Sequence, residues 1–106
     1  MVERKLISWI IPCFNEEEVI IKSLNEIIEV SDSIINYQWE LIIVDDGSID
    51  KTSELVRTFT NNKFDIHLIQ FSRNFGHQQA VQAGLDHCKG NAAIIIDADL
   101  QDPPHL

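Results

Sequence analysis

The chain contains little cysteine and little positive charge. Its 106 residues include only two cysteines, Cys13 and Cys88, which are far apart and form no Cys-x-x-Cys pair. Neither a zinc site nor a disulfide framework is therefore predicted, which fits a reducing cytoplasm. The 17 Asp and Glu residues outnumber the 8 Lys and Arg residues, so the formal net charge is −9. Because nucleic-acid phosphates are bound by basic surfaces, this balance argues against a nucleic-acid partner.

Long apolar runs are also missing. No stretch approaches the roughly 18 residues of a membrane-spanning helix. The apolar segment 6–14 is short and is interrupted by Ser8 and Pro12, unlike the core of a signal peptide. The chain is too short for two independent hydrophobic cores. We therefore expect one soluble folded unit covering residues 1–106.

Four apolar segments rich in β-branched residues recur along the chain, at 6–11, 40–44, 66–71 and 92–96. Their last residues are 33, 27 and 25 positions apart (11 to 44, 44 to 71, 71 to 96), close to the roughly 30 residues of a βαβ unit. The pattern predicts the α/β class, with a Rossmann-like parallel sheet and helices on its faces. The apolar segment 92–96 is expected to be a buried strand.

The intervals between these strands carry helical spacing. Segment 16–30 is expected to bury the stripe Ile20, Leu24, Ile27 and Ile28, and Asn15 with Glu18 resembles a capping box before it. Asp50 is expected to cap a second helix carrying Leu55, Val56 and Phe59. A third helix is expected to stop at Gly90 and to share one face among Val81, Gly84, Leu85 and Cys88.

Polar residues follow every expected strand. Ligands of open parallel sheets bind beyond the carboxyl ends of the strands, so the segments 12–16, 45–48, 72–74 and 97–99 are expected to form one functional rim. Asp97 and Asp99 are two positions apart and in extended chain would leave the same face, with Cα atoms roughly 6.6 Å apart. Like charges this close favour a shared divalent cation. The alternative is that Asp97 ends a strand and Asp99 caps a turn.

Asp45 and Asp46 are neighbours and should point to opposite faces, so we expect one to reach a ligand and the other to fix the loop. A simple Asp-Gly turn is the alternative. Arg73 is expected either to face a phosphate or to be solvated. Trp9 and Trp39 are expected to pack in the core. The histidines have no mutual ligand spacing and are expected to be structural or exposed: His67, His77, His87 and His105.

The segments 10–16, 44–52, 72–80, 83–86 and 97–104 together resemble the start of the family 2 inverting glycosyltransferases with a GT-A fold. Segments 73–76 and 97–104 are similar to those of the polyprenyl-phosphate sugar transferases. The resemblance covers nearly the whole chain in the right order. It implies that the chain is the N-terminal, nucleotide-sugar-binding half of such a domain.

The resemblance also implies a site. Pro12, Phe14 and Glu16 would line the nucleotide pocket, where Phe14 replaces a frequent Tyr and lacks its hydroxyl. Val44 and Asp46 would contact the base or ribose, and Arg73 would belong to the same nucleotide-sugar site. The metal and diphosphate segment would be Asp97, Ala98, Asp99 and Gln101, with Mg²⁺ or Mn²⁺ held by Asp97, Asp99 and Gln101.

The implied reaction transfers a sugar from a UDP- or GDP-sugar to an acceptor, a polyprenyl (undecaprenyl or dolichyl) phosphate, with inversion and metal assistance. The acceptor site, the base and any membrane helices would follow Leu106, which would place the full protein at the cytoplasmic face of the membrane. Pro103 and Pro104 look like the start of another helix. A domain cut there would expose a sheet edge, so a homo-oligomer is possible.

Two alternatives remain open at this level. An Asp-dependent phosphoryl-transfer domain also gathers aspartates at strand ends, and it would be revealed by aspartyl phosphorylation. The chain could instead be a non-catalytic interaction module, for which self-association is the expected behaviour.

Overall fold

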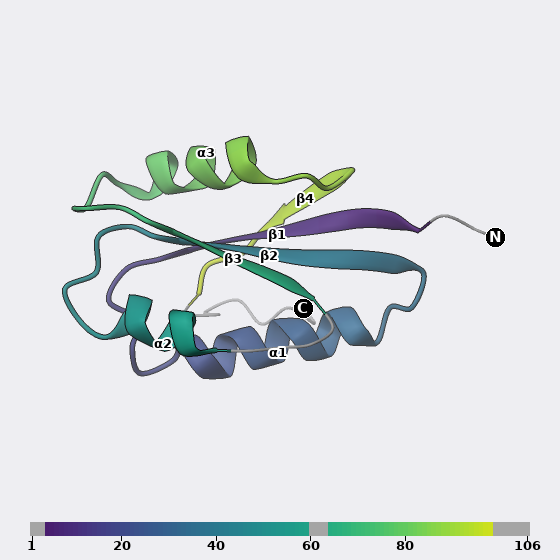
Figure 1. Ribbon diagram of the computed structural model, residues 1–106, viewed down its shortest axis with the longest axis horizontal. Coiled ribbons are helices and arrows are strands. Elements are labelled where there is room, and N and C mark those ends of the chain that lie inside the picture. The colour runs from purple at the N-terminus through teal and green to yellow at the C-terminus, as the bar shows by residue number, and fades with distance from the viewer. Residues whose placement is uncertain (1–3, 60–63, 99–106) are drawn as a thin grey trace.

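The computed structural model describes residues 4–59 and 64–98, in which strands and helices alternate strictly (Figure 1). The elements are β1 (Lys5–Cys13), α1 (Ile20–Asp32), β2 (Tyr37–Asp45), α2 (Thr52–Thr58), β3 (Asp65–Gln70), α3 (His77–His87) and β4 (Ala92–Ile95). The strands form one parallel sheet in the order β3-β2-β1-β4. The predicted α/β class is confirmed, and each predicted strand is present with its ends displaced by at most three residues.

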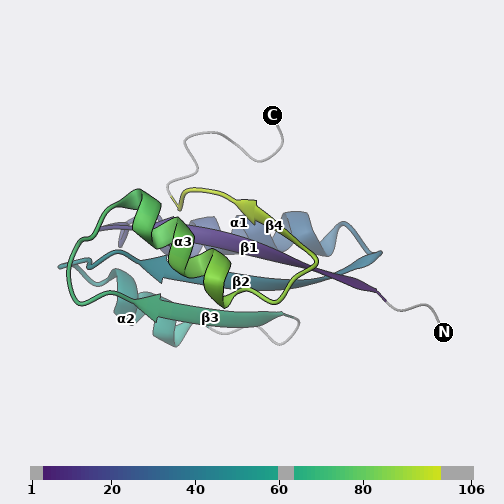
Figure 2. The ribbon, with the colours of Figure 1, turned by 90° about the horizontal axis from the view of Figure 1, so that it is seen from above.

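The helices cover both faces of the sheet, with α1 and α2 on one side and α3 on the other (Figures 1 and 2). Because side chains alternate along a strand, β1 and β2 supply both cores. On the α1 side, Trp9, Ile11, Leu41 and Ile43 pack against the buried stripe of α1. On the α3 side, the core consists of Ile10, Ile42, Val44 and Ala80. This two-sided burial explains why β2 is apolar at consecutive positions.

Helix α1 buries the predicted residues Ile20, Leu24, Ile27 and Ile28. The predicted capping box is wrong, because α1 begins at Ile20 and no side chain caps its N-terminus. Asn15 instead adopts a positive φ of 53°, and its side-chain oxygen accepts a hydrogen bond from the N–H of Ile49. The Trp9 and Trp39 rings stack in the core with centroids 5.8 Å apart, as predicted.

The face of α3 that packs on the sheet differs in part from the predicted one. Ala80 and Gly84 are its buried residues, whereas Leu85 is 38% exposed. Gly84 lies over Ile10, so a larger residue there would meet the sheet. The helix ends at His87, before the predicted stop at Gly90.

A buried polar group fixes the turn from α3 to β4. The Glu40 carboxylate, in a residue only 3% exposed, accepts hydrogen bonds from the Ser8 hydroxyl at 2.6 Å and the Lys89 N–H at 2.7 Å. The Gly90 N–H donates to the Ser8 oxygen at 2.9 Å. Strand β4 therefore starts from a fixed point.

The apolar segment 92–96 forms a strand, as predicted, but the predicted burial of this strand is wrong. All residues of β4 are exposed, with Ile94 at 40% and Ile95 at 47%. The reason is position: β4 pairs with β1 alone among the described strands, and it forms an edge of the sheet over which α3 does not extend (Figure 2). Among the helices that the structure describes, none is long and apolar enough to cross a membrane.

Candidate functional site

The predicted rim forms a cavity of about 350 Å³ at the carboxyl ends of β1, β2 and β4. Backbone hydrogen bonds extend the sheet into it: the N–H groups of Asp46 and Ala98 donate to the carbonyls of Cys13 and Pro12. These hydrogen bonds hold the end of β1 beside the end of β2 and beside the segment that follows β4. The cavity is lined by Pro12, Cys13, Phe14, Glu16, Asp46, Asn74, Gly76, His77, Ala80, Asp97 and Ala98.

Asp46 forms one wall of the cavity and anchors the loop between β3 and α3. Its Oδ1 accepts hydrogen bonds from the N–H groups of Phe75 at 2.7 Å and Gly76 at 3.3 Å. Its Oδ2 accepts from the Gly76 N–H at 3.0 Å and the Asn74 amide at 3.1 Å. Donated N–H groups compensate the charge of a buried carboxylate. Asp46, only 5% exposed, therefore fixes the segment that leads into α3.

Asp45 fixes its own loop, as one of the pair was predicted to do. It is fully buried and accepts hydrogen bonds from the N–H and hydroxyl of Ser48 and from the hydroxyl of Ser53. It does not line the cavity. Both aspartates are thus loop anchors, and only Asp46 also faces the cavity.

The loop after β1 is fastened to the loop after β2. The Asn15 N–H donates to the Ser48 hydroxyl and the Glu16 N–H to the Thr52 hydroxyl, each at 2.8 Å. This connection holds Phe14 and Glu16 at the cavity, where the ring of Phe14 is 41% exposed.

The prediction that Asp50 caps α2 is wrong, because the N-cap residue of α2 is Lys51 and no side chain makes a capping hydrogen bond there. Asp50 lies one position earlier and fastens the loop instead. Its carboxylate accepts hydrogen bonds from the Thr52 N–H at 3.0 Å and the Glu17 N–H at 3.2 Å. Partial burial acts to raise the pKa of Asp50, but the hydrogen bonds from Thr52 and Glu17 outweigh it and lower the pKa. Asp50 therefore contributes to the fold in its ionised form.

Asp97 reaches the cavity from the segment after β4. Its Oδ1 lies 2.9 Å from Nε2 of His77, the first residue of α3. Ala98 beside it is buried, and its carbonyl accepts a hydrogen bond from the Ser23 hydroxyl of α1. Asp97 and Ala98 are thus hydrogen-bonded to helices on both faces of the sheet, α3 through His77 and α1 through Ser23.

The cavity is acidic. Glu16, Asp46 and Asp97 line it, and no Lys or Arg is among its described lining residues. Burial, together with the nearby carboxylates of Asp45 and Glu16, raises the pKa of the Cys13 thiol. A raised pKa favours the neutral thiol of Cys13, which is a poor nucleophile.

Some predicted site residues lie elsewhere. The Val44 side chain is fully buried in the core beneath α3, and the Arg73 guanidinium lies 4.7 Å from the centre of the Phe75 ring rather than at the cavity. Asp99 and Gln101 lie outside the described residues. Within residues 4–59 and 64–98, no three His, Cys, Asp or Glu side chains are grouped to hold a metal ion.

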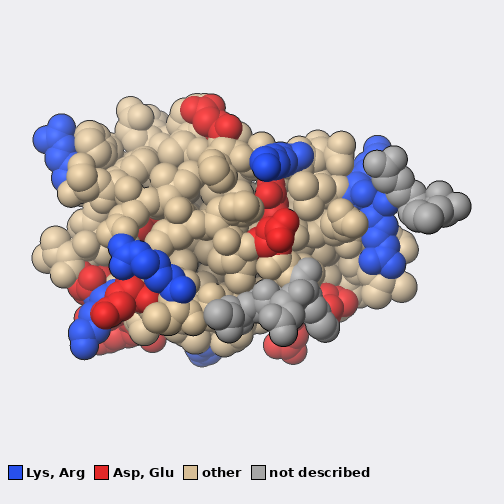
Figure 3. All heavy atoms as spheres, in the orientation of Figure 1, with Lys and Arg blue, Asp and Glu red and all other residues tan. Residues whose placement is uncertain are grey.

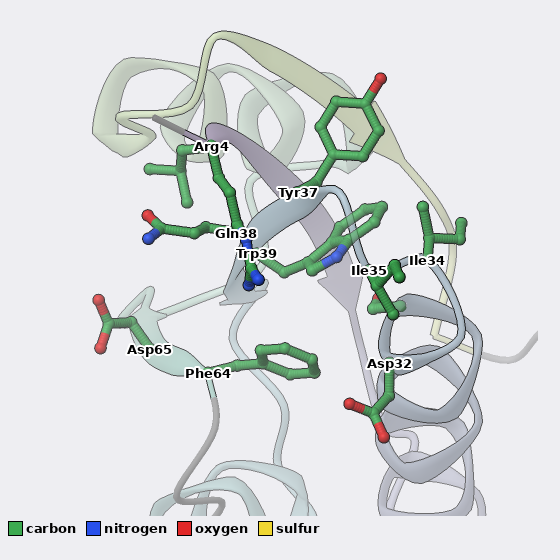
Figure 4. Close-up of a pocket in the computed structure, with 11 residues that line it drawn as sticks. Arg4, Asp32, Ile34, Ile35, Tyr37, Gln38, Trp39, Phe64 and Asp65 are labelled. Carbon is green, nitrogen blue, oxygen red and sulfur yellow. The ribbon is translucent and has the colours of Figure 1, made fainter. Parts of the chain in front are cut away.

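A second hollow, of about 560 Å³, lies at the opposite end of the sheet, near the start of β2 and β3 (Figure 4). Tyr37, Trp39 and Phe64 line it, with Asp65 at its margin. The Trp39 indole nitrogen has no hydrogen-bond partner in the described part of the chain, but it is shielded from solvent. We assign the site to the rim, because the cavity there is lined by polar residues that follow three strands of the sheet.

Comparison with known proteins shows the family of the chain. The sequence profile described as "Glycosyl transferase family 2" matches residues 8–106. The chain belongs to this family. The phosphoryl-transfer alternative is thereby replaced by a glycosyltransferase domain.

Named relatives give further detail. The chain is 46% identical over 99 residues to an uncharacterized glycosyltransferase, YkcC, of Bacillus subtilis (strain 168), covering 93% of this chain and 30% of the relative. It is 40% identical over 107 residues to the bactoprenol glucosyl transferase of Shigella phage SfV, covering 94% and 34%. The chain thus spans about a third of the length of these relatives.

A solved structure supports the fold assignment. The mannosyltransferase PcManGT of Pyrobaculum calidifontis, in complex with GDP-Man and Mn²⁺, superposes with a TM-score of 0.80 at 28% identity. The match covers 92% of this chain and 28% of that protein. The predicted GT-A fold is therefore confirmed for the part that this chain represents.

The cavity contains one polar residue whose place there was not predicted. His77 is 60% exposed, in line with the expectation that it is structural or exposed, but it also lines the cavity and contacts Asp97. Its position directly after Gly76, at the end of a polar loop that follows a strand, was the available signal. A search restricted to spacing between histidines could not detect it, because its partner is an aspartate 20 positions away.

Proposed function

We propose that this chain is the donor-binding part of a glycosyltransferase that moves a sugar from a UDP- or GDP-sugar to a polyprenyl phosphate. One observation carries the proposal: residues expected to bind the nucleotide sugar, although distant in sequence, line a single cavity. They are Pro12, Phe14, Glu16, Asp46, Asp97 and Ala98. Its location beyond the carboxyl ends of parallel strands is where such sheets bind ligands.

The two sides of the cavity suit different parts of the donor. Phe14 offers an exposed ring for the base, and Glu16 could accept a hydrogen bond from base or ribose. On the other side α3 begins, with Gly76 and His77 at the cavity. The N-terminus of a helix favours anionic groups. We therefore place the diphosphate beside the start of α3 and Asp97.

An acidic cavity and an anionic diphosphate require a positive charge between them. The donor chemistry fits Mg²⁺ or Mn²⁺, because carboxylate oxygens are the ligands that these hard cations prefer. Asp97 would be one ligand, and Asp99 and Gln101, outside the described residues, would be the others. The bound cation would stabilise the negative charge of the departing nucleoside diphosphate.

The acceptor assignment draws on the bactoprenol named for the phage relative. An acceptor oxygen would attack the anomeric carbon opposite the departing diphosphate, which inverts the configuration. A phosphate oxygen is already anionic and needs little help from a general base. We assign residues 1–106 to the donor half. The acceptor site, any base and any membrane attachment would belong to the part of the relatives beyond this match, at the cytoplasmic face of the membrane.

Binding experiments test the proposal. Calorimetric titration of the folded chain with UDP-glucose and GDP-mannose, with and without Mn²⁺, should show binding that depends on the metal. Asp99→Ala should abolish the metal-dependent part, and Asp97→Ala should weaken it to a level that can still be measured. Asp65→Ala is the matched control, since Asp65 lies at the other end of the sheet, and it should bind like the wild type. Absence of nucleotide binding by folded protein would refute the proposal.

The exposed edge strand β4 also supports self-association of the chain. Light scattering that shows only monomer over a range of concentrations would contradict it.

A further inference from the structure

The contact between His77 and Asp97 joins two elements that are far apart in the sequence. The imidazole Nε2 lies 2.9 Å from Asp97 Oδ1, and both side chains line the cavity. A carboxylate accepts hydrogen bonds, so Nε2 carries the hydrogen and donates it. The contact lies on the surface of the cavity, where His77 is 60% and Asp97 63% exposed.

The backbone on both sides of this contact is held in place. Asp46 binds the N–H groups of Phe75 and Gly76, directly before His77. After β4, the N–H of Ile96 donates to the carbonyl of Ile10 at 3.0 Å, and the N–H of Ala98 donates to the carbonyl of Pro12 at 3.3 Å. The position of the Asp97 Cα is therefore fixed, but an exposed carboxylate would still rotate about its side-chain bonds. The hydrogen bond from His77 selects one of its orientations.

We propose that His77 is a positioning residue that acts through Asp97, holding its carboxylate in the orientation that receives the nucleotide sugar or its metal. The inference rests on the proposed function. A hydrogen bond that orders a carboxylate in advance lowers the entropy lost on binding. Partners of this kind around metal ligands typically change affinity by about 10–100-fold.

A double-mutant cycle tests this role. The affinity for Mn²⁺ and UDP-glucose or GDP-mannose is measured for the wild type, His77→Ala, Asp97→Ala and the double variant. His77→Ala should weaken binding about 10-fold or more, and the double variant should bind no more weakly than Asp97→Ala alone. His77→Gln keeps an N–H donor of similar reach and should recover most of the loss. His87→Ala, at the far end of α3, is the matched control and should have no effect.

A second measurement needs no ligand. The ¹⁵N shift of His77 Nε2 in the free protein should change in Asp97→Ala and stay unchanged in Asp65→Ala. Melting temperatures should be alike for all variants, which separates positioning from a structural role.

The results distinguish failure of the inference from failure of the proposed function. Wild-type binding that responds to Asp97→Ala but not to His77→Ala refutes the inference alone. The inference is also refuted if His77→Ala lowers the affinity by the same factor in the wild type and in Asp97→Ala. His77 would then act on the ligand directly. Folded wild-type protein that binds no nucleotide refutes the proposed function, and the inference with it.

Discussion

Replacement of Gly47 by alanine should destabilise the fold and disturb the cavity wall. Gly47 follows Asp46 with a φ of +77°, a left-handed conformation that costs alanine about 1–2 kcal/mol. An added Cβ would lie 2.6 Å from the Arg73 carbonyl oxygen, and closer still to backbone atoms of Arg73 and Asn74. Because backbone cannot rotate aside, this overlap adds about 1–3 kcal/mol. The expected loss is about 2–5 kcal/mol, a large part of the roughly 5–15 kcal/mol typical of a domain.

Urea unfolding followed by tryptophan fluorescence measures this loss, since Trp9 and Trp39 are both buried. Gly76→Ala is the matched control. Gly76 also has a positive φ, of +106°, but no atom lies within 4 Å of an added Cβ, so its cost of about 1–3 kcal/mol reflects backbone strain alone. Gly47→Ala should be less stable than Gly76→Ala and should bind nucleotide more weakly than the wild type. Equal stability of the two variants would refute the close-approach argument.

Three other changes test the fold around the site. Glu40→Ala should cost about 1–3 kcal/mol in chemical denaturation, because it leaves the buried Ser8 hydroxyl and the partly buried Lys89 N–H without their acceptor; exposed Glu29→Ala should change stability by less than about 0.5 kcal/mol, and similar losses would contradict the assignment. Asp50 has a lowered pKa, so its contribution is present above its unfolded pKa of about 3.9 and is lost as pH falls through the folded value. The wild type should thus exceed Asp50→Asn by about 0.3–1 kcal/mol at pH 7, because Asn lacks the charge near the start of α2, and it should approach Asp50→Asn in acid; a difference independent of pH would count against this. Gly84→Ala should cost about 1–3 kcal/mol through contact with Ile10, and an unchanged melting temperature would show that the helix can shift freely.

The order and class of the elements could be predicted from the sequence because their signals are local. Apolar runs with β-branched residues fall at intervals of a βαβ unit, and Ile20, Leu24, Ile27 and Ile28 repeat with the period of a helix. The predictions that proved wrong concern local sequence patterns that are compatible with two different structures. The run 92–96 looks like a buried strand, but its burial depends on neighbours that pack against it, and β4 lies at the edge of the sheet.

Hydrogen bonds between loops were the second feature that could not be predicted from the sequence. Asn15 and Glu18 have the spacing of a capping box, yet Asn15 binds the N–H of Ile49, 34 positions away. Asp45 and Asp46 were correctly expected to differ, but their partners on other loops could not be identified. A side chain that satisfies a donor in a distant loop leaves no periodic pattern in the sequence.

The surface charge also has one property that follows from the sequence and another that depends on the fold. The net charge of −9 follows from the composition, whereas its distribution is a property of the folded chain. On the face shown in Figure 3, acidic and basic side chains are interspersed rather than collected into one patch. Carboxylates are also grouped inside the cavity, where Glu16, Asp46 and Asp97 line one hollow.

The strands, the helices and the four polar segments at the strand ends can be predicted from local sequence, because hydrophobic periodicity and turn chemistry act over a few residues. Which of those polar side chains meet is set by the fold. It brought Asp46 and Asp97 to one cavity, placed Val44 in the core and Arg73 against Phe75, and paired His77 with Asp97. The physical reason is that parallel strands bring distant loops to one edge of the sheet, where long-range hydrogen bonds select the partners.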